Sequence, residues 1–129
     1  LKSGKIVLCD RYIDSTIAYQ GYGRNLDMNL INQLNSITTS GLKSDLTLWL
    51  DLDVEQGMAR KLKSGDKADR IEQEKIDFHR RVQKGYKDKA ALSPERNIKI
   101  EAGLNKEDVQ KQIQQILTKK LQEWGIGNW

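Results

Sequence analysis

The sequence predicts an α/β domain in which helices flank a parallel sheet. Short, continuous apolar runs are typical of strands that are buried on both faces. Longer amphipathic segments separate these runs, and strands that alternate with helices are typical of a parallel sheet. With 129 residues, the chain has the length of one domain, so we expect a single domain over residues 1–129.

Three apolar runs are predicted to be strands. They cover residues 6–9, 46–52 and 97–102, and the first of them ends at Asp10. Cys9 is the only cysteine, so it has no partner for an intramolecular disulfide. Its position inside an apolar run predicts a small buried hydrophobic residue.

Helical segments fill the gaps between the predicted strands. Asp27 is a good N-cap for a helix whose apolar residues recur at helical spacing. A second helix follows Asp53, and a long one is predicted over about residues 70–91. Asn105 caps the last helix, on which apolar residues recur from position 109 to 124.

Composition and charge set broad limits on function. The formal net charge is +4 and 31% of residues are charged, but Lys and Arg alternate with Asp and Glu along the chain. This mixture predicts a solvated surface and argues against nucleic-acid binding, which requires a concentrated basic face. No run approaches the roughly 18 apolar residues of a membrane span. We therefore expect a cytoplasmic protein that does not enter a membrane.

The first cluster of candidate functional residues follows the first predicted strand. Ligands of parallel α/β folds bind at the carboxyl ends of strands, where Asp10, Arg11 and Tyr12 lie. The planar guanidinium of an arginine holds a phosphate through two parallel hydrogen bonds. Asp10 either orients this arginine or hydrogen-bonds to a metal-bound water, and a purely structural ion pair is an equal alternative.

The next residues extend this cluster along a predicted helix. Tyr12, Thr16, Tyr19 and Gln20 are three or four residues apart and share one helical face. A carboxamide pairs with the edge of a base, and an aromatic ring stacks on a ligand or limits its size. This face indicates a nucleotide site, or a helix that packs polar residues into an interface.

A second cluster is the basic segment 60–72, which lies between two predicted helices and contains Gly65. In phosphoryl transfer, negative charge spreads over the oxygens of the transferred group, and positive charge brought to them lowers the barrier. A basic flap suits this chemistry. The alternative is a solvated turn between helices.

Two runs in these clusters resemble one enzyme family. The run Asp-Arg-Tyr-Ile-Asp-Ser-Thr-Ile-Ala-Tyr-Gln-Gly, residues 10–21, resembles the Asp-Arg-Tyr segment of bacterial thymidylate kinases. The run Asp-Arg-Ile-Glu at 69–72 resembles the end of the LID of that family. The resemblance covers about residues 4–122. It implies a P-loop nucleoside-monophosphate-kinase fold and phosphoryl transfer from ATP to dTMP, giving dTDP and ADP, with Mg²⁺ accompanying ATP.

The resemblance implies roles for the residues of the first cluster. It places Asp10 and Arg11 in the dTMP site, with Arg11 gripping the phosphate. Thr16 touches the thymine edge, and Gln20 matches a glutamine that contacts the base. Tyr19 matches a tyrosine that crowds the sugar 2′ position and so favours deoxyribose.

The resemblance also implies a set of residues on the ATP side. Arg70 is the closest match to a catalytic arginine supplied by the LID, acting together with Arg11, although Lys67 leaves the choice of cation open. The run from Ile100 resembles an Ile-Asp-Ala turn near the adenine, with Glu in place of Asp. The complete implied set is Arg60, Lys67, Asp69, Arg70, Glu72 and Ala102.

The sequence contains no Gly-rich P-loop motif that ends in Lys-Ser/Thr. In the fold that the resemblance implies, the P-loop strand lies between the strands that match 6–10 and 45–53. We therefore expect a single partial kinase domain in which these two strands have unpaired edges. Its functional parts are the dTMP phosphate and base segment (1–24), the LID (63–72), and the last strand with the C-terminal helix (97–124).

Three expectations follow for the chain as a whole. Because the implied ATP cradle does not occur in it, we expect the chain alone to be inactive. We expect a homodimer that binds dTMP and ATP and no nucleic acid, with the helix at 27–39 contributing to the interface. The rival interpretations are a related nucleoside or nucleotide kinase, and a basic nucleic-acid-binding or interaction fragment without catalysis.

Overall fold

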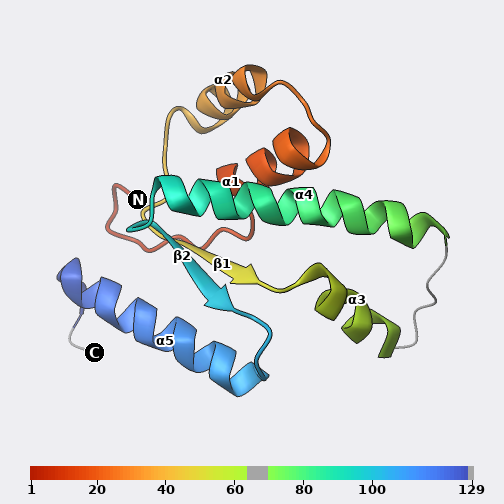
Figure 1. Cartoon of the computed structure of the whole chain (residues 1–129). Helices are drawn as coiled ribbons and strands as arrows, with labels where there is room; N and C mark the ends of the chain where they lie inside the picture. The colour runs from red at the N-terminus through yellow and green to blue at the C-terminus, as the bar shows by residue number, and fades with distance from the viewer. Residues whose placement is uncertain (64–69, 128–129) are drawn as a thin grey trace.

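The chain forms an α/β structure with a two-stranded parallel sheet between layers of helices (Figure 1). The computed structural model describes the backbone of residues 1–63 and 70–127, and side chains in 1–61 and 75–127. The elements, in chain order, are α1 (Ile13–Thr16), the π-helix η1 (Ile17–Gly23), α2 (Met28–Thr39), β1 (Thr47–Asp51), α3 (Val54–Lys63), α4 (Arg70–Leu92), β2 (Asn97–Glu101) and α5 (Lys106–Glu123). The predicted fold class is confirmed.

Strands β1 and β2 confirm two of the three predicted strands. They pair in parallel, from Thr47 opposite Asn97 to Asp51 opposite Glu101. Helix α4 covers one side of this sheet, with α1 and α2 beyond it, and α5 covers the other (Figure 1). Only one edge of β1 is therefore paired within the described residues.

The prediction of a strand at residues 6–9 is wrong. This segment has no regular structure, and its side chains are exposed, with Leu8 91% exposed. Cys9, predicted to be buried, is exposed as well. An apolar run becomes a buried strand only where a neighbouring strand pairs with it. No strand lies beside this segment in the described part of the chain, so its apolar side chains stay in solvent.

Helix α4 packs closely on η1, and glycines permit the approach. Gly85 of α4 is buried, and a Cβ atom added to it would lie 2.9 Å from the ring of Tyr22 and 3.0 Å from the Cα of Ala18. Ala18 and Val82 are buried in this contact. The helix that bears the first candidate cluster is thus held against α4 by backbone-to-backbone packing.

Both predicted N-caps of long helices are confirmed. The Asp27 carboxylate accepts a hydrogen bond from the backbone N–H of Asn29 at the start of α2, at 3.0 Å. The Asn105 carboxamide accepts one from the N–H of Asp108 at the start of α5, at 2.9 Å. Each bond satisfies one backbone donor that has no partner within its helix.

The helix predicted across residues 12–20 changes type within this segment. It begins as the single-turn helix α1 and continues as a π-helix from Ile17 to Gly23. A π-helix has more residues in each turn than an α-helix, so residues three apart no longer share a face, whereas residues four apart still lie close together. The shared face predicted for Thr16, Tyr19 and Gln20 is therefore altered at Tyr19, three residues after Thr16.

No helix in the described part of the chain has the length and apolar content that a membrane span requires.

Candidate functional site

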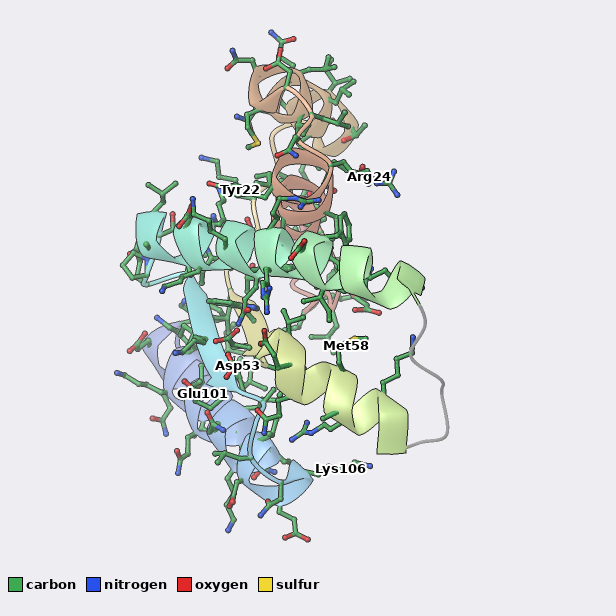
Figure 2. The ribbon with its side chains drawn as sticks, turned by 45° about the vertical axis from the view of Figure 1, so that its right-hand side comes forward. Tyr22, Arg24, Asp53, Met58, Glu101 and Lys106 are labelled. Carbon is green, nitrogen blue, oxygen red and sulfur yellow. The ribbon has the colours of Figure 1, made fainter. Side chains whose placement is uncertain are left out.

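The main cavity is a large groove beside the unpaired edge of β1. Its volume is about 1480 Å³. Residues 5–12 form one wall, residues 42–54 form the opposite wall, and side chains of α4 and α5 close it. The end of the segment at residues 5–12 and the end of β1 therefore both lie on the groove, and these are the positions where the sequence predicts ligands to bind. Asp53 lies at that end of the sheet, near Glu101 (Figure 2).

Arg11 is positioned at the groove by its backbone and by an aromatic ring. Its φ of 61° lies in the left-handed region, which a residue with a Cβ atom rarely adopts. The Cζ atom of its guanidinium lies 5.0 Å from the centroid of the Tyr19 ring. Cation–π attraction holds the charge in place, and the guanidinium forms no ion pair with Asp10. The structural ion pair considered from the sequence does not form.

Tyr19 belongs to a cluster of rings that joins three elements. Its centroid lies 6.0 Å from that of Phe78 and 6.5 Å from that of Tyr86, both on α4. Tyr86 in turn stacks on Trp49 of β1, with 5.9 Å between centroids and 15° between ring planes. These contacts tie the π-helix to the sheet through α4.

Tyr86 lies among polar groups as well as rings. Burial raises the pKa of its phenol, while a hydrogen bond to Ser15 acts in the opposite direction. Tyr19, Arg11 and Asp14 lie close enough to influence it electrostatically. Tyr86 therefore contacts both the aromatic rings of Tyr19 and Trp49 and the polar groups around its phenol.

Not all residues predicted for the dTMP site lie on the groove. Asp10, Arg11 and Tyr19 line it, whereas Thr16 and Gln20 are not among the described residues that do so. Thr16 is exposed and Gln20 is half-buried on η1. Arg11 and Tyr19, predicted to contact the phosphate and the sugar of dTMP, thus lie together on the groove. Thr16 and Gln20, predicted to contact the base, do not line it.

Arg60 and Ala102, both predicted to lie on the ATP side, do come together. The Arg60 guanidinium donates to the backbone carbonyls of Ala102 and Gly103, each at 3.1 Å, and of Leu104 at 3.4 Å. Gln56 of the same helix also donates to the Gly103 carbonyl, at 3.3 Å, so two side chains tie α3 to the turn after β2. The roles predicted for these two residues stay predictions.

The LID residues lie partly outside the described structure. Lys67 and Asp69 fall in the undescribed segment 64–69, and the side chains of Arg70 and Glu72 are likewise outside the described residues. The assignment of the catalytic cation therefore stays a prediction.

Carboxylates at the groove suit a magnesium ion only in part. Asp51 accepts a hydrogen bond from the Gln83 amide at 3.0 Å, and Asp10 and Asp53 line the groove as exposed groups. No three His, Cys, Asp or Glu residues converge into a metal-binding group in the described part of the chain. Mg²⁺ in nucleotide sites is held by one or two carboxylates together with phosphate oxygens, and these aspartates fit that pattern.

The sequence profile of one family covers most of the chain. The profile described as thymidylate kinase matches residues 1–113. The chain belongs to the thymidylate kinase family.

Individual thymidylate kinases are similar to the chain over nearly all of its length. One from Nostoc sp. is 64% identical over 124 residues, which are 96% of this chain and 59% of the relative. One from Trichodesmium erythraeum is 60% identical over 96% of this chain and 54% of the relative. The chain thus spans somewhat more than half the length of these relatives.

The fold is similar to that of a solved thymidylate kinase. A crystal structure of the enzyme from Ehrlichia chaffeensis aligns with a TM-score of 0.67 and 32% sequence identity. The alignment covers 91% of this chain and 53% of that chain. The small sheet is consistent with a chain that spans about half of the thymidylate kinase structure.

Sequence reasoning missed three residues that the structure places at the groove. The sequence pattern indicates only that Trp49 and Tyr86 pack in the interior. Apolar periodicity cannot show that two rings from distant elements stack on each other. Asp14 lies within the recognised run at 10–21, but it was assigned no role. Its signal is a carboxylate in the first turn of a helix that continues into the buried residues Ile17 and Ala18.

Proposed function

We propose that this chain forms the acceptor part of an enzyme that transfers a phosphoryl group from ATP to dTMP, giving dTDP and ADP. Family membership supports the reaction. The single structural observation that supports the acceptor site is Arg11, stacked on Tyr19 at the mouth of the groove. A cation held by a ring retains its N–H groups for a phosphate.

Arg11 receives the dTMP phosphate in this proposal. Its side chain forms no hydrogen bond with other described residues, so its fork of donors is available for bidentate binding. Tyr19 lies against the arginine and faces the sugar, where it excludes a ribose 2′-hydroxyl. Thr16 at the end of α1 and Gln20 on η1 reach the thymine, which requires the base to extend beyond the groove toward these helices.

In this proposal the chain also contributes residues to the ATP side of the site. Arg60 and the turn at Ala102 border the adenine, and the LID supplies Arg70 as the catalytic cation, with Lys67, Asp69 and Glu72 around the phosphates. Mg²⁺ bound with ATP would neutralise charge on the phosphates, and Asp10 and Asp53, which both line the groove, are the carboxylates that we propose to assist it. The protein contributes positioning and charge rather than a covalent intermediate.

We also propose the setting of the enzyme. It works in the cytoplasm as a homodimer. The exposed apolar residues of α2 support an interface there, because Leu30 and Leu34 are each about half exposed and Ile37 is 74% exposed.

The experiment compares two proteins in a coupled assay for dTDP. One is this chain alone, and the other is this chain joined to the part of the Nostoc thymidylate kinase that lies outside the match. We expect dTDP only from the joined protein, with dTMP preferred over other nucleoside monophosphates. Replacing Arg11 by Ala in the joined protein should abolish most of that activity.

Two results would contradict the proposal. Robust dTDP formation by the chain alone would disprove its dependence on a separate ATP cradle. A joined protein that phosphorylates another monophosphate better than dTMP would identify a related nucleotide kinase. Salt-dependent DNA binding by an inactive joined protein would instead favour the nucleic-acid-binding interpretation.

A further inference from the structure

The ring of Tyr19 is contacted from outside the groove by Phe78 on α4. The two ring centroids lie 6.0 Å apart and the ring planes are tilted by 58°, which is a favourable aromatic contact. Tyr19 lines the groove, whereas Phe78 is not among the described residues that line it. Phe78 therefore touches the ring that we assign to the sugar of dTMP, but it lies behind the groove rather than in it.

Phe78 is itself held against the end of η1 by Gly23 and Arg81. Gly23 is buried, and a Cβ atom added to it would lie 2.6 Å from Cε2 and 3.0 Å from Cζ of the Phe78 ring. The ring thus lies directly on the glycine backbone, which only a residue without a side chain permits. The Arg81 guanidinium lies 6.0 Å from the centroid of the same ring, and its Nε donates a hydrogen bond to the Gly23 carbonyl at 3.0 Å. Two neighbours therefore fix the ring that contacts Tyr19.

The position of the Tyr19 ring depends on the space beside it. A side chain shorter than phenylalanine at position 78 leaves a cavity next to this ring, and surrounding side chains relax partly into such a cavity. Exclusion of a single hydroxyl group requires that the excluding side chain be held to within roughly 0.5 Å by neighbours that are themselves well packed. Phe78, held by Gly23 and Arg81, meets this requirement.

We propose that Phe78 is a positioning residue for sugar selectivity. It holds the Tyr19 ring where a ribose 2′-hydroxyl would lie, so that a deoxyribonucleoside monophosphate is accepted and its ribose counterpart is rejected. This inference rests on the proposed function, which places the sugar of dTMP at Tyr19. Phe78 acts through Tyr19 and not through the nucleotide, and Gly23 provides the backbone surface on which its ring lies.

The test measures selectivity in the joined protein, as the ratio of kcat/KM for dTMP to kcat/KM for ribothymidine 5′-monophosphate. Phe78→Leu keeps an apolar side chain but removes the ring that contacts Tyr19. We expect this variant to lower the ratio about tenfold, through a higher kcat/KM for the ribonucleotide, while kcat for dTMP changes by less than about threefold. A residue that only maintains the fold affects both substrates equally and leaves the ratio unchanged.

Two further variants serve as controls. Ile31→Val truncates a buried apolar residue of α2 that is not among the described residues lining the groove. It should lower the Tm, as Phe78→Leu does, and leave the selectivity ratio unchanged. In a Tyr19→Ala background, Phe78→Leu should not lower the ratio further, because residues that act as one unit are not additive.

The inference is overturned if Phe78→Leu leaves the ratio unchanged, or if Ile31→Val lowers it equally. It is also overturned if Phe78→Leu lowers the ratio by the same factor with and without the Tyr19 side chain. A joined protein that phosphorylates dTMP and ribothymidine 5′-monophosphate equally well overturns it too, although the proposed reaction would stand. A joined protein that forms no dTDP contradicts the proposed function itself, and this inference with it.

Discussion

The guanidinium of Arg11 lies over the ring of Tyr19, with 5.0 Å between Cζ and the ring centroid. One cost accompanies this position, because the backbone of Arg11 has a φ of 61°, in the left-handed region. The carboxylate of Asp14, which lines the same groove, has the opposite charge and favours the guanidinium there. Strained backbone conformations of this kind are concentrated at binding sites. The relationship makes Arg11 the residue whose replacement is most informative.

Replacement of Arg11 by Gly or by Ala should separate binding from stability. Both variants should lose at least tenfold in dTMP affinity, about 1.4 kcal/mol, because both lack the phosphate-binding fork. The free energy of unfolding of the Gly variant should be about 1 kcal/mol larger than that of the Ala variant, because only Gly adopts a φ of 61° without strain. Calorimetry and urea unfolding measure the two quantities. Equal stability of the variants would mean that the backbone there is unstrained.

Two helix glycines should respond to alanine in opposite directions. At Gly85 an added Cβ would meet the Tyr22 ring at 2.9 Å and the Ala18 Cα at 3.0 Å. Gly85→Ala should cost about 2 kcal/mol, because α4 must move away from η1. At Gly57 the nearest atom lies at 3.4 Å, an ordinary contact with Leu52. Gly57→Ala should stabilise by about 0.5–1 kcal/mol in unfolding experiments. An unchanged stability of Gly85→Ala would contradict the close packing of α4 on η1.

Removal of the Arg60 side chain should loosen the ATP side without affecting dTMP binding. Arg60→Ala loses three hydrogen bonds to the carbonyls of residues 102–104. Because the side chain is exposed, we expect a loss of only about 1 kcal/mol in the free energy of unfolding. Arg24→Ala, at another exposed arginine, is the control and should cost almost nothing. Hydrogen exchange at the amides of 102–105 should accelerate in the first variant alone.

Alkaline pH should destabilise the chain partly through Tyr86. Burial raises the pKa of its phenol above the ordinary value of 10.0, so the folded state holds this proton more tightly than the unfolded state. The contribution is fully present below pH 10 and is lost as the pH rises through the folded value. Tyr86→Phe should reduce the fall in stability above pH 10, measured by urea unfolding. A residual fall is expected from Tyr22, whose pKa burial also raises. An unchanged fall would place the Tyr86 phenol in solvent.

Most elements could be predicted from local pattern, because caps and apolar periodicity are local properties. Asp27 and Asn105 cap the helices they were expected to cap. The strand at residues 6–9 could not be predicted correctly. Its apolar run has the composition of a strand, but pairing depends on a neighbour that is absent from the described residues. The sequence of an apolar run does not show whether a neighbouring strand is available to pair with it.

The residue types of the candidate site could be predicted from the sequence better than the relative positions of their side chains. Arg11 and Tyr19 were expected at one site, and they are in contact. Thr16 and Gln20 were expected beside Tyr19, but the helix becomes a π-helix at Ile17, and of these three residues only Tyr19 lines the groove. Ala18 of this π-helix packs against Gly85 of α4, a contact between residues far apart in the sequence that a local pattern does not predict.

A thermal melt with and without millimolar dTMP tests the central claim most directly, because a ligand that binds only the folded state raises the Tm. We predict that dTMP raises the Tm of this chain, that AMP does so much less, and that the dTMP effect disappears in Arg11→Ala. A Tm that does not respond to dTMP, or a dTMP effect that persists in Arg11→Ala, would contradict the assignment of the Arg11–Tyr19 pair as the acceptor site.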